Sequence, residues 1–443
     1  MFRALRPTVL DRGHMSLPFR RPAGAIASLF TRGVGDAGVG HVLGIIRKQL
    51  GMDVAFVSRF RATDRVFEHV DADRPAPIHV GQTLPLHEGY CLKVVQGELP
   101  EFIPDTSAVP AAMAIPATSA IPIGAHLSTP VRLENGELYG TLCCFSYHPD
   151  RSLGDRDIGM LRAFAEVLAH RVDENLAASR HKERAAEMIW AAMASGAPRI
   201  VYQPIYELRA RRLVGVECLA RFDVEPQRGP DKWFDGAREA GVSVELELQA
   251  VRNALGALDR LPPSVFLAIN SSPDLILSGR LEAVLGALDA SRIVLEITEH
   301  VTVDDYGALA AALRPLRERG IRLAVDDAGA GYASMRHILH LKSEIIKLDM
   351  SLTRDIDTDP ARRALARGLI SFASDIGSDI TAEGVETAGE LEVLRSLGVA
   401  KVQGYHLGRP GSLEDAVIAC RTGCPAFAAP GTSPRPDASL ARQ

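Results

Sequence analysis

Short apolar runs recur along the second half of the chain, and nearly every run ends in a polar side chain. Between residues 199 and 410 there are eight of these runs, which read RIVYQPI, LVGVECL, VFLAIN, IVLEI, RLAVDD, EIIKLD, ITAEG and KVQGY. Runs of this length and composition predict buried β-strands. Most of the segments between them are long enough for a helix, which parallel strands require as a crossover. The pattern therefore predicts a closed α/β barrel of the (β/α)8 TIM type.

The first connection departs from this pattern. Only residues 207–212 separate the first two runs, and this segment is too short for a crossover helix. The first strand is therefore expected to pair with the second as an antiparallel hairpin, which makes the barrel irregular.

The first half of the chain has a different pattern, which predicts a separate α+β domain. A helix is expected over residues 42–50 and a strand over residues 54–59. Two later strand patterns, LSTPVRL and LYGTLCCFS, are joined by a segment that contains Asn135 and Gly136, a strong hairpin signal. Beyond residue 150 the period changes, and a helix is predicted from the apolar stripe at Ile158, Leu161, Phe164, Leu168, Val172 and Leu176.

Residues 172–194 contain neither glycine nor proline and are rich in alanine, glutamate, arginine and lysine. This composition favours a helix over a flexible tether. Such a helix would either transmit a signal between the two domains or only space them apart, and both interpretations stay open. The expected organisation is a flexible arm (1–24), the α+β domain (25–175), a helical linker (176–196), the barrel (197–420) and a disordered tail (421–443).

The composition argues against several classes of protein. The net charge of the 443-residue chain is −5, without the basic excess of a protein that coats a nucleic acid polymer. No apolar stretch approaches the length of about 18 residues that a transmembrane helix needs, so no membrane insertion is expected. The six cysteines show neither a disulfide framework nor zinc-ligand spacing, which favours reduced thiols and a cytoplasmic location.

Cys91 follows Gly89 and Tyr90 in the first domain, and it has two interpretations. It is either a reactive thiol that undergoes oxidation or forms an adduct, or a small buried apolar residue. Leu92 follows it where bilin-binding proteins usually carry a histidine, so a covalently attached chromophore is not expected. The sequence does not indicate which ligand or signal this domain detects.

The polar residues at the strand ends carry the candidate chemistry. The carboxyl ends of parallel barrel strands meet on one rim, so these side chains are expected to lie close together. They are Gln203, Glu217, Asn270, Glu296, Asp326, Asp327, Lys347, Glu383 and Gln403. The carboxylates among them would repel one another unless cations lie between them. Oxygen ligands suit hard divalent ions such as Mg²⁺ or Mn²⁺, so the rim is expected to bind metal.

Several motifs within roughly residues 195–415 resemble those of a known family. Glu217-Cys218-Leu219, with Ala220-Arg221, is followed by LAIN, LEITE, DDAGAGY, IKLD, AEGVET and QGYHLGRP. In order and spacing, these motifs resemble the EAL domain, a family of phosphodiesterases that linearise the bacterial messenger cyclic di-GMP. The signature tripeptide is Glu-Cys-Leu here in place of Glu-Ala-Leu, and its middle residue is not a metal ligand.

The first domain resembles another family. The string NGELYGTLCCFSYHPDRSLGDRDIGMLRAFAEVLAHRV is similar to the C-terminal half of a GAF domain, a small sensor module. Together the two resemblances imply a sensor-regulated phosphodiesterase that forms a homodimer and converts cyclic di-GMP into linear pGpG.

The resemblance to EAL domains also implies roles for the rim residues, with two Mg²⁺ or Mn²⁺ ions in one active site. Around one ion the family pattern places Glu217, Asn270, Glu296 and Asp326. Asp327, next in the chain, allows a second ion close by, and Glu383 would support that ion or act as the base. Lys347 would orient the attacking water or neutralise developing charge. The catalytic candidates are thus Glu217, Lys347 and Glu383.

Other residues match family positions that contact the substrate or an adjoining loop. Arg221 would offer a planar guanidinium group to a phosphate, and the nucleotide groove would be lined by Gln203, Leu219 and Gln403. Glu299 resembles the family residue that holds the loop after the two aspartates. That loop has alanine at positions 328, 330 and 333, where the family commonly has larger or hydroxylated residues. These changes affect the packing of the loop and leave the ligand set intact.

Two alternative functions stay open at this point. The chain would be a receptor that binds cyclic di-GMP without cleaving it, as degenerate EAL domains do, or a barrel hydrolase that acts on another phosphate ester. No motif of the Gly-Gly-Asp/Glu-Glu-Phe type occurs, so synthesis of the messenger is not expected.

Overall fold

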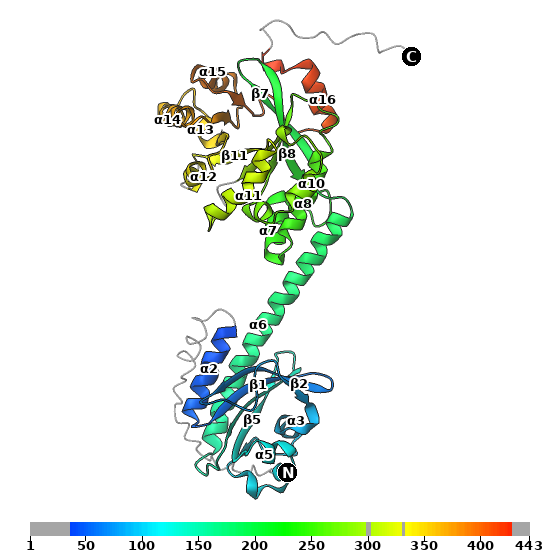
Figure 1. Cartoon of the computed structure of the whole chain (residues 1–443), viewed down its shortest axis with the longest axis vertical. Coiled ribbons are helices and arrows are strands. Elements are labelled where there is room, and N and C mark those ends of the chain that lie inside the picture. Colours follow the sequence, from blue (N-terminus) through cyan, green and yellow to red (C-terminus); the bar gives the residue numbers. More distant parts are fainter. Residues whose placement is uncertain (1–35, 298–302, 330–332, 428–443) are drawn as a thin grey trace, which may run out of the picture. The chain divides into compact units, whose positions relative to one another are not determined.

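The computed structural model describes residues 36–297, 303–329 and 333–427 (Figure 1). These residues form two compact units, of which the first ends at Arg180 and the second begins at His181. The predicted arm (1–24) and residues 428–443 of the predicted tail lie outside the described residues. Within the described residues, no helix is both long and apolar enough to cross a membrane.

The first unit is built on a six-stranded antiparallel sheet with the strand order β3-β2-β1-β6-β5-β4. Its strands are β1 (Val54–Phe60), β2 (Asp64–Ala72), β3 (Thr83–Pro85), β4 (Phe102–Ile103), β5 (Ala125–Arg132) and β6 (Leu138–Ser146). The predicted hairpin joins β5 to β6, and Gly136 in its turn has a φ of 83°. Glycine adopts this left-handed conformation without strain, which explains why the chain reverses there.

Helices cover both faces of this sheet, which gives the α+β domain that the sequence predicts. On one face lie α2 (Asp36–Gln49) and the first half of α6 (Asp155–Ala194). The other face is covered by α3 (Tyr90–Val95), α4 (Pro110–Met113) and α5 (Pro116–Ala120), with the 3-10 helices η1 (Leu86–Glu88) and η2 (Thr106–Ala108) nearby. Successive strand residues point to opposite faces, so Cys143 belongs to one apolar core and Cys144 to the other.

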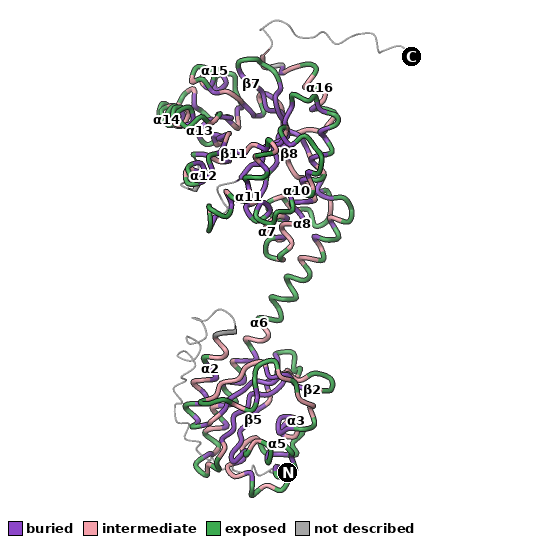
Figure 2. Tube along the Cα trace, viewed as in Figure 1, coloured by how far each residue is buried: buried purple, intermediate pink, exposed green. Residues whose placement is uncertain are grey.

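α6 includes residues 176–194 of the predicted linker. Residues 174–184 of this helix are all exposed (Figure 2). Near its C-terminal end, Ile189 and Ala192 are buried again, in a cluster with Trp233 of the second unit. The helix therefore supplies apolar side chains to the cores of both units.

The second unit is a closed barrel of strands in the order β7-β8-β9-β10-β11-β12-β13-β14. They are β7 (Arg199–Glu207), β8 (Arg212–Arg221), β9 (Phe266–Asn270), β10 (Ile293–Ile297), β11 (Arg322–Ala328), β12 (Ile345–Leu348), β13 (Asp379–Ala382) and β14 (Lys401–Val402). β7 is antiparallel to both of its neighbours, β8 and β14, and the other neighbouring strands are parallel. The predicted barrel and its antiparallel first hairpin are confirmed.

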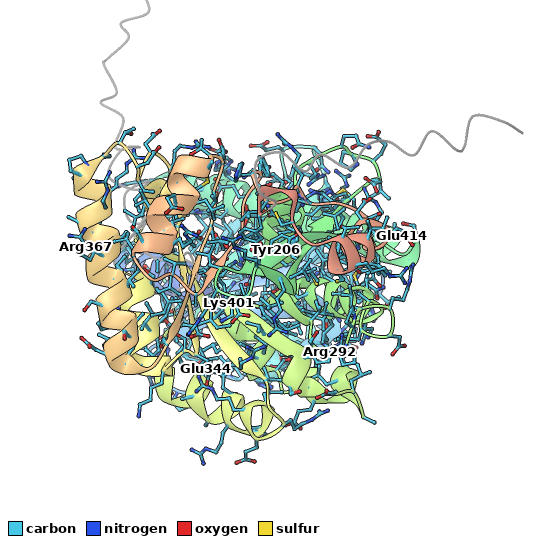
Figure 3. The ribbon with its side chains drawn as sticks, turned by 90° about the horizontal axis from the view of Figure 1, so that it is seen from above. Tyr206, Arg292, Glu344, Arg367, Lys401 and Glu414 are labelled. Atoms are coloured by element: carbon cyan, nitrogen blue, oxygen red, sulfur yellow. The ribbon has the colours of Figure 1, made fainter. Side chains whose placement is uncertain are left out.

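Helices follow most of the strands and surround the barrel. They are α7 (Pro230–Ala240), α8 (Ser243–Leu255), α9 (Pro273–Leu277), α10 (Leu281–Leu285), η3 (Ala290–Arg292), α11 (Tyr306–Glu318), α12 (Ala333–Leu341), α13 (Met350–Thr353), α14 (Pro360–Ile376), α15 (Ala388–Ser396) and α16 (Leu413–Thr422). Figure 3 shows the end of the barrel at which the parallel strands begin, with Arg292, Glu344 and Lys401 at or next to the starts of β10, β12 and β14.

The second unit extends further along the chain than expected. Residues 421–427 belong to the predicted disordered tail, but α16 continues to Thr422 and the 3-10 helix η4 (Pro425–Phe427) follows it. Cys424 is buried in the main core of the barrel, and Phe427 packs edge-to-face on Tyr206 with 5.7 Å between the ring centroids. The proline- and alanine-rich composition predicted disorder here, whereas these two side chains anchor the segment.

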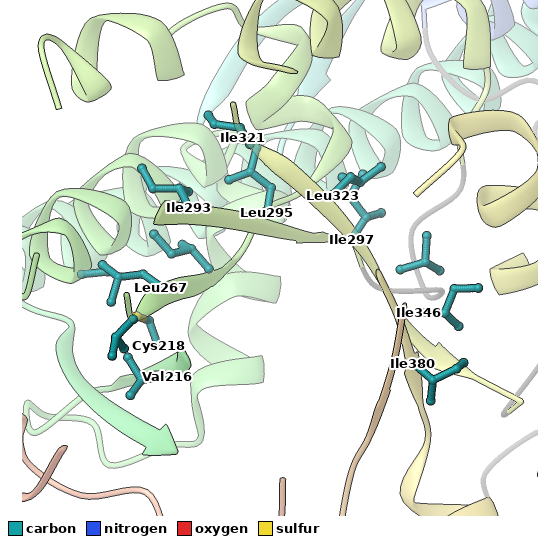
Figure 4. Close-up of a cluster of buried hydrophobic side chains, with 14 of the residues drawn as sticks. Val216, Cys218, Leu267, Ile293, Leu295, Ile297, Ile321, Leu323, Ile346 and Ile380 are labelled. Atoms are coloured by element: carbon teal, nitrogen blue, oxygen red, sulfur yellow. The ribbon is translucent and has the colours of Figure 1, made fainter. Parts of the chain in front are cut away.

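Alternation along the strands separates the outside of the barrel from its interior. In β10, Ile293, Leu295 and Ile297 point outward and pack in the main core between strands and helices (Figure 4). The residues between them point inward. An interior apolar layer results, made of Ile205, Val214, Phe266, Ala268, Val294, Ala324 and Ile345. Glu296 follows Val294 by two positions, so it also faces the interior and lies closer to the C-terminal rim.

Candidate active site

Polar side chains occupy the interior positions directly above the apolar layer. Asp326 follows Ala324 by two residues in β11, and Lys347 has the same place in β12. Glu217 of β8 lies beside Gln203 of β7 in the strand register. The apolar layer thus forms the floor of a polar site, and the same alternation that buries the apolar residues points these side chains into it.

Lys347 lies at the centre of this site, and its side chain is only 2% exposed. Its Nζ atom is 2.8 Å from a carboxylate oxygen of Glu383 and 2.9 Å from one of Glu296. The same atom is 2.9 Å from Asp326 and 3.5 Å from Glu217. A single buried ammonium group therefore faces four carboxylates that come from four different strand ends.

The electrostatics of this group favour an additional cation. Burial raises the pKa of Glu296 well above its usual range, and burial raises the pKa of Glu383 to about 8. Burial also opposes the charge on Lys347, but the surrounding carboxylates outweigh this effect and raise its pKa well above normal. Lys347 therefore stays charged, yet one ammonium group cannot neutralise four carboxylates. Protons or further cations must balance the remaining negative charge.

Asp326 and Asp327 both face the site although they are neighbours in one strand. Adjacent strand residues normally point to opposite faces. Here the register between β11 and β12 shifts between Val325 and Ala328, and Asp327 has a φ of 56°. This left-handed conformation is uncommon for residues other than glycine, although aspartate tolerates it better than most. The local irregularity therefore brings two consecutive carboxylates to one place.

Two groups of carboxylates are arranged so that each can hold a metal ion. Glu217, Glu296 and Asp326 form one group, and Asp326, Asp327 and Glu383 form the other. Within each group, one oxygen atom from each residue lies within 4.8 Å of the others. Asp326 belongs to both groups, which places it where a carboxylate would bridge two ions. Asn270 ends β9 beside Glu296 in the register and adds an amide oxygen next to the first group.

Gln203 and Gln403 are buried against Glu217. The amide nitrogen of Gln403 donates hydrogen bonds to a carboxylate oxygen of Glu217 and, at 2.9 Å, to Oε1 of Gln203. Gln203 in turn donates to the carbonyl oxygen of Gly408 at 3.2 Å. The two glutamines thereby orient Glu217, while their predicted contact with a nucleotide stays a prediction. Oε1 of Gln403 is buried without a hydrogen-bond partner among the described residues.

A cleft of about 410 Å³ opens beside this group of acids. Leu219 and Arg221, two of the predicted substrate contacts, line it together with Asn270, a predicted metal ligand. Its walls also include apolar and acidic side chains from α7 and α8, which are Phe234, Asp231, Asp235 and Glu247. Arg221 is half-buried, and its guanidinium group donates to the carbonyl oxygen of Ala220 at 2.7 Å.

Glu390 supports the site, and sequence reasoning missed it. Its buried carboxylate accepts hydrogen bonds from the backbone N–H groups of Asp355 at 3.0 Å, Glu386 at 2.7 Å and Thr387 at 3.0 Å. These contacts fasten the segment after Glu383 to the segment that follows α13. The signal was present, because Thr387 and Glu390 form a capping box at the start of α15. Glu299, the predicted loop anchor, lies outside the described residues.

Family models match both units of the chain. Residues 186–410, just over half of the chain, match the family model of the EAL domain. The chain belongs to the EAL domain family. Residues 39–172 match the model of the GAF domain, which covers the first unit. Asp326, which belongs to both groups of carboxylates, lies within the part of this EAL chain that the family model matches.

Curated relatives match the EAL part of this chain. The uncharacterized protein y4lL of Sinorhizobium fredii is 31% identical over 240 residues, which are 52% of this chain and 29% of that protein. The cyclic di-GMP phosphodiesterase PA2567 of Pseudomonas aeruginosa is 33% identical over 225 residues, which are 48% of this chain and 38% of that protein. The alignments therefore span about a third of the length of these relatives.

A solved structure has a similar fold over more of the chain. It is the EAL enzyme Bd1971 in a form bound to cAMP and cyclic di-GMP, with a TM-score of 0.52 and 17% sequence identity. The similarity covers 84% of this EAL chain and 93% of that one. At this identity the comparison supports the fold alone.

Proposed function

We propose that this EAL protein is a metal-dependent phosphodiesterase that hydrolyses cyclic di-GMP to linear pGpG. The observation that carries the proposal is the position of Asp326, which two separate groups of carboxylates share. Support also comes from the EAL family model and from the relative named as a cyclic di-GMP phosphodiesterase. Hydrolysis of a phosphodiester requires charge neutralisation and an activated water, and a pair of oxygen-ligand sites suits both needs.

The residues fit two divalent cations. Their donor atoms are oxygens, which Mg²⁺ and Mn²⁺ prefer, and their negative charge exceeds what Lys347 balances. Oε1 of Gln403, buried without a partner among the described residues, would accept a hydrogen bond from a metal-bound water. One ion would be held by Glu217, Asn270, Glu296 and Asp326, and the other by Asp326, Asp327 and Glu383. Bound ions supply Lewis acidity to the phosphoryl oxygens and lower the pKa of water.

The chain's own groups would then position the reaction. Lys347 keeps its proton and holds the carboxylates in place through its ion pairs. Burial raises the pKa of Glu383 to about 8 when no ion is bound, and cations held by the neighbouring carboxylates would lower it and favour the ionised form. The ionised carboxylate would then support an ion or accept the proton that the attacking water loses. Arg221 and Leu219 in the cleft would contact a phosphate and a nucleoside of the substrate.

Replacing Glu383 with Gln separates catalysis from binding. Glutamine keeps the shape of the side chain but has no charge to hold a metal ion or accept a proton, so turnover should fall by at least about a hundredfold. Cyclic di-GMP affinity, measured by calorimetry in Ca²⁺, should change little. Glu392→Gln on the exposed face of α15 is the matched control, and it should leave turnover unchanged. If the affinity for cyclic di-GMP falls together with turnover, Glu383 also contributes to substrate binding and does not act in the chemical step alone.

The first unit would regulate this activity. Its match to the GAF domain supports a sensor role, and α6 contributes to the cores of both units. A chain shortened to begin at about Arg184 retains Ile189 and Ala192, which pack against Trp233, so the barrel should still fold. We expect its hydrolysis rate to differ severalfold from that of the 443-residue chain, which requires only about 1 kcal/mol of coupling.

Hydrolysis rates of the two chains, measured over a range of metal and protein concentrations, test this regulation. The range of protein concentrations also tests whether the predicted homodimer contributes. Equal rates throughout would show that the first unit does not influence the barrel.

A further inference from the structure

The first unit contains a polar group of side chains inside an otherwise apolar core. Cys91 of α3 and Cys143 of β6 lie in the core that covers one face of the sheet, with 3.5 Å between their Sγ atoms. Nη1 of Arg65 lies 2.7 Å from Sγ of Cys91 and donates a hydrogen bond to it. Arg65 is itself only 5% exposed. A buried arginine that contacts a thiol requires a negative charge nearby, and the Cys91 thiolate can provide it.

A glycine makes the contact between Arg65 and Cys91 possible. An added Cβ atom at Gly89 would overlap the guanidinium group of Arg65. The backbone of Gly89 has a φ of −132°, which any residue can adopt, so glycine is needed here for space and not for conformation. The residue that precedes Tyr90 and Cys91 thus leaves room for the arginine.

The surroundings of Cys91 and Cys143 shift the pKa values of the two thiols in opposite directions. A hydrogen bond from Cys143, together with the charge of Arg65, lowers the pKa of Cys91 to about 5 although burial opposes this. Burial raises the pKa of Cys143 well above its usual range. Burial and the charge of Arg65 lower the pKa of His126 to about 3, so His126 is neutral and Arg65 is the cation at this thiol. Cys91 is therefore placed as a nucleophile, with a protonated thiol beside it.

A small cavity reaches the Cys91 thiol. Its volume is about 40 Å³, and Arg65, Gly89, Cys91 and His126 are among its lining residues. A cavity needs only about 10–15 Å³ to hold a water molecule, so this one can admit a molecule slightly larger than water. It is too small for most organic ligands. The Cys91 thiol is almost completely buried, so this cavity determines which reagents reach it.

We propose that Cys91 and Cys143 form a site at which a small hydroperoxide, such as hydrogen peroxide, oxidises a dithiol to a disulfide. Sγ of Cys91 attacks one peroxide oxygen, the O–O bond breaks, and the departing hydroxide takes up a proton to become water. Cys91 is then a sulfenic acid. Sγ of Cys143 attacks the Cys91 sulfur and loses its proton, the S–O bond breaks, and the hydroxyl group leaves as a second water. The peroxide is reduced and the two thiols are oxidised.

The geometry requires little movement for the second step. The sulfur atoms are 3.5 Å apart, and a disulfide bond is about 2.05 Å long, so they must approach by about 1.5 Å. The hydroxyl groups of Ser128 and Thr141 lie 3.1 Å and 3.2 Å from Sγ of Cys143 and can accept or donate hydrogen bonds as its proton leaves.

Cys144 provides an internal control. It follows Cys143 directly but belongs to the core on the opposite face of the sheet. Burial raises its pKa to about 12, against the lowering effect of Arg47. It is buried to the same extent as Cys143 and lacks a cysteine partner among the described contacts, so it should resist oxidation under conditions that oxidise Cys91.

Peptide mapping of the purified chain after treatment with about one equivalent of hydrogen peroxide tests the proposal directly. We expect a disulfide between Cys91 and Cys143, with Cys144 still reduced. Cys143→Ser should stop the reaction at the sulfenic acid of Cys91, which dimedone traps, and Cys144→Ser should form the disulfide as the unaltered chain does. Arg65→Met should slow the oxidation of Cys91 by about tenfold, because the thiolate loses its counter-ion.

The unaltered chain decides the proposal even if a variant fails to fold. A map without the link between Cys91 and Cys143, or oxidation of Cys144 as fast as that of Cys91, would overturn it. So would an Arg65→Met variant that folds, as judged by circular dichroism, and reacts at the unaltered rate.

Discussion

Asp326→Asn should lower the rate of cyclic di-GMP hydrolysis by about a thousandfold, which corresponds to about 4 kcal/mol of transition-state stabilisation. The asparagine has nearly the same shape, but it loses the charge and one of the two oxygens that a bridging ligand needs. Asp326 belongs to both groups of carboxylates, so the substitution weakens both proposed ion sites at once. Loss of any carboxylate that serves only one group should have a smaller effect.

Steady-state kinetics and Mn²⁺ binding by calorimetry measure this effect together. Asp379→Asn is the matched control, because Asp379 starts β13 at the opposite end of the barrel and its side chain is 59% exposed. That variant should keep both the rate and the metal affinity of the unaltered chain. If Asp326→Asn keeps more than about a tenth of the turnover with the same metal dependence, Asp326 does not bridge the ions.

Lys347→Met should destabilise the metal-free protein by about 3–5 kcal/mol and should also remove most of its activity. Lys347 is the ammonium group that contacts all four carboxylates, at distances of 2.8–3.5 Å. Removing one partner of a buried ion pair leaves charges uncompensated, which costs about this much. Divalent cations should recover part of the lost stability, because they bind the same carboxylates in the folded state and not in the unfolded chain.

Urea denaturation measures the free energy of unfolding of the barrel, first with a chelator and then with Mg²⁺ or Mn²⁺. Lys232→Met is the control, since Lys232 also contacts two carboxylates but its side chain is 67% exposed. Exposed ion pairs contribute little, so this variant should change the free energy of unfolding by less than about 1 kcal/mol. A Lys347→Met protein as stable as the Lys232→Met protein without metal would show that the ammonium group is not needed to balance the acids.

The sequence predicted the barrel because its strands are short, apolar and separated by helix-length segments. The short connection at residues 207–212 also predicted the antiparallel pairing of β7 and β8. The site followed from the same pattern, since the polar residues at the strand ends lie on interior positions above the apolar layer. Strand alternation is local and therefore visible in the sequence.

The less predictable features depend on contacts between distant segments. Gln403 bonds Gln203 and Glu217 only because the barrel closes between β14 and β7, which join the two ends of the domain. No local pattern specifies the left-handed backbone at Asp327, which brings its carboxylate beside that of Asp326. The position of Cys91 beside Arg65 and Cys143 likewise depends on how α3 packs on the sheet. The burial of Cys91 agrees with its interpretation as a small buried apolar residue. Its contacts with Arg65 and Cys143 support its interpretation as a reactive thiol.

Incubation of the purified 443-residue chain with cyclic di-GMP tests the central claim most directly. The reactions would contain Mg²⁺, Mn²⁺ or excess chelator. Chromatography would separate the nucleotides, and mass spectrometry would identify them. Conversion to linear pGpG that requires the metal and stops on chelation is the expected result. Cyclic di-GMP that is bound but remains intact in both metals would identify a receptor, and hydrolysis that continues in the chelator would contradict the metal site built around Asp326.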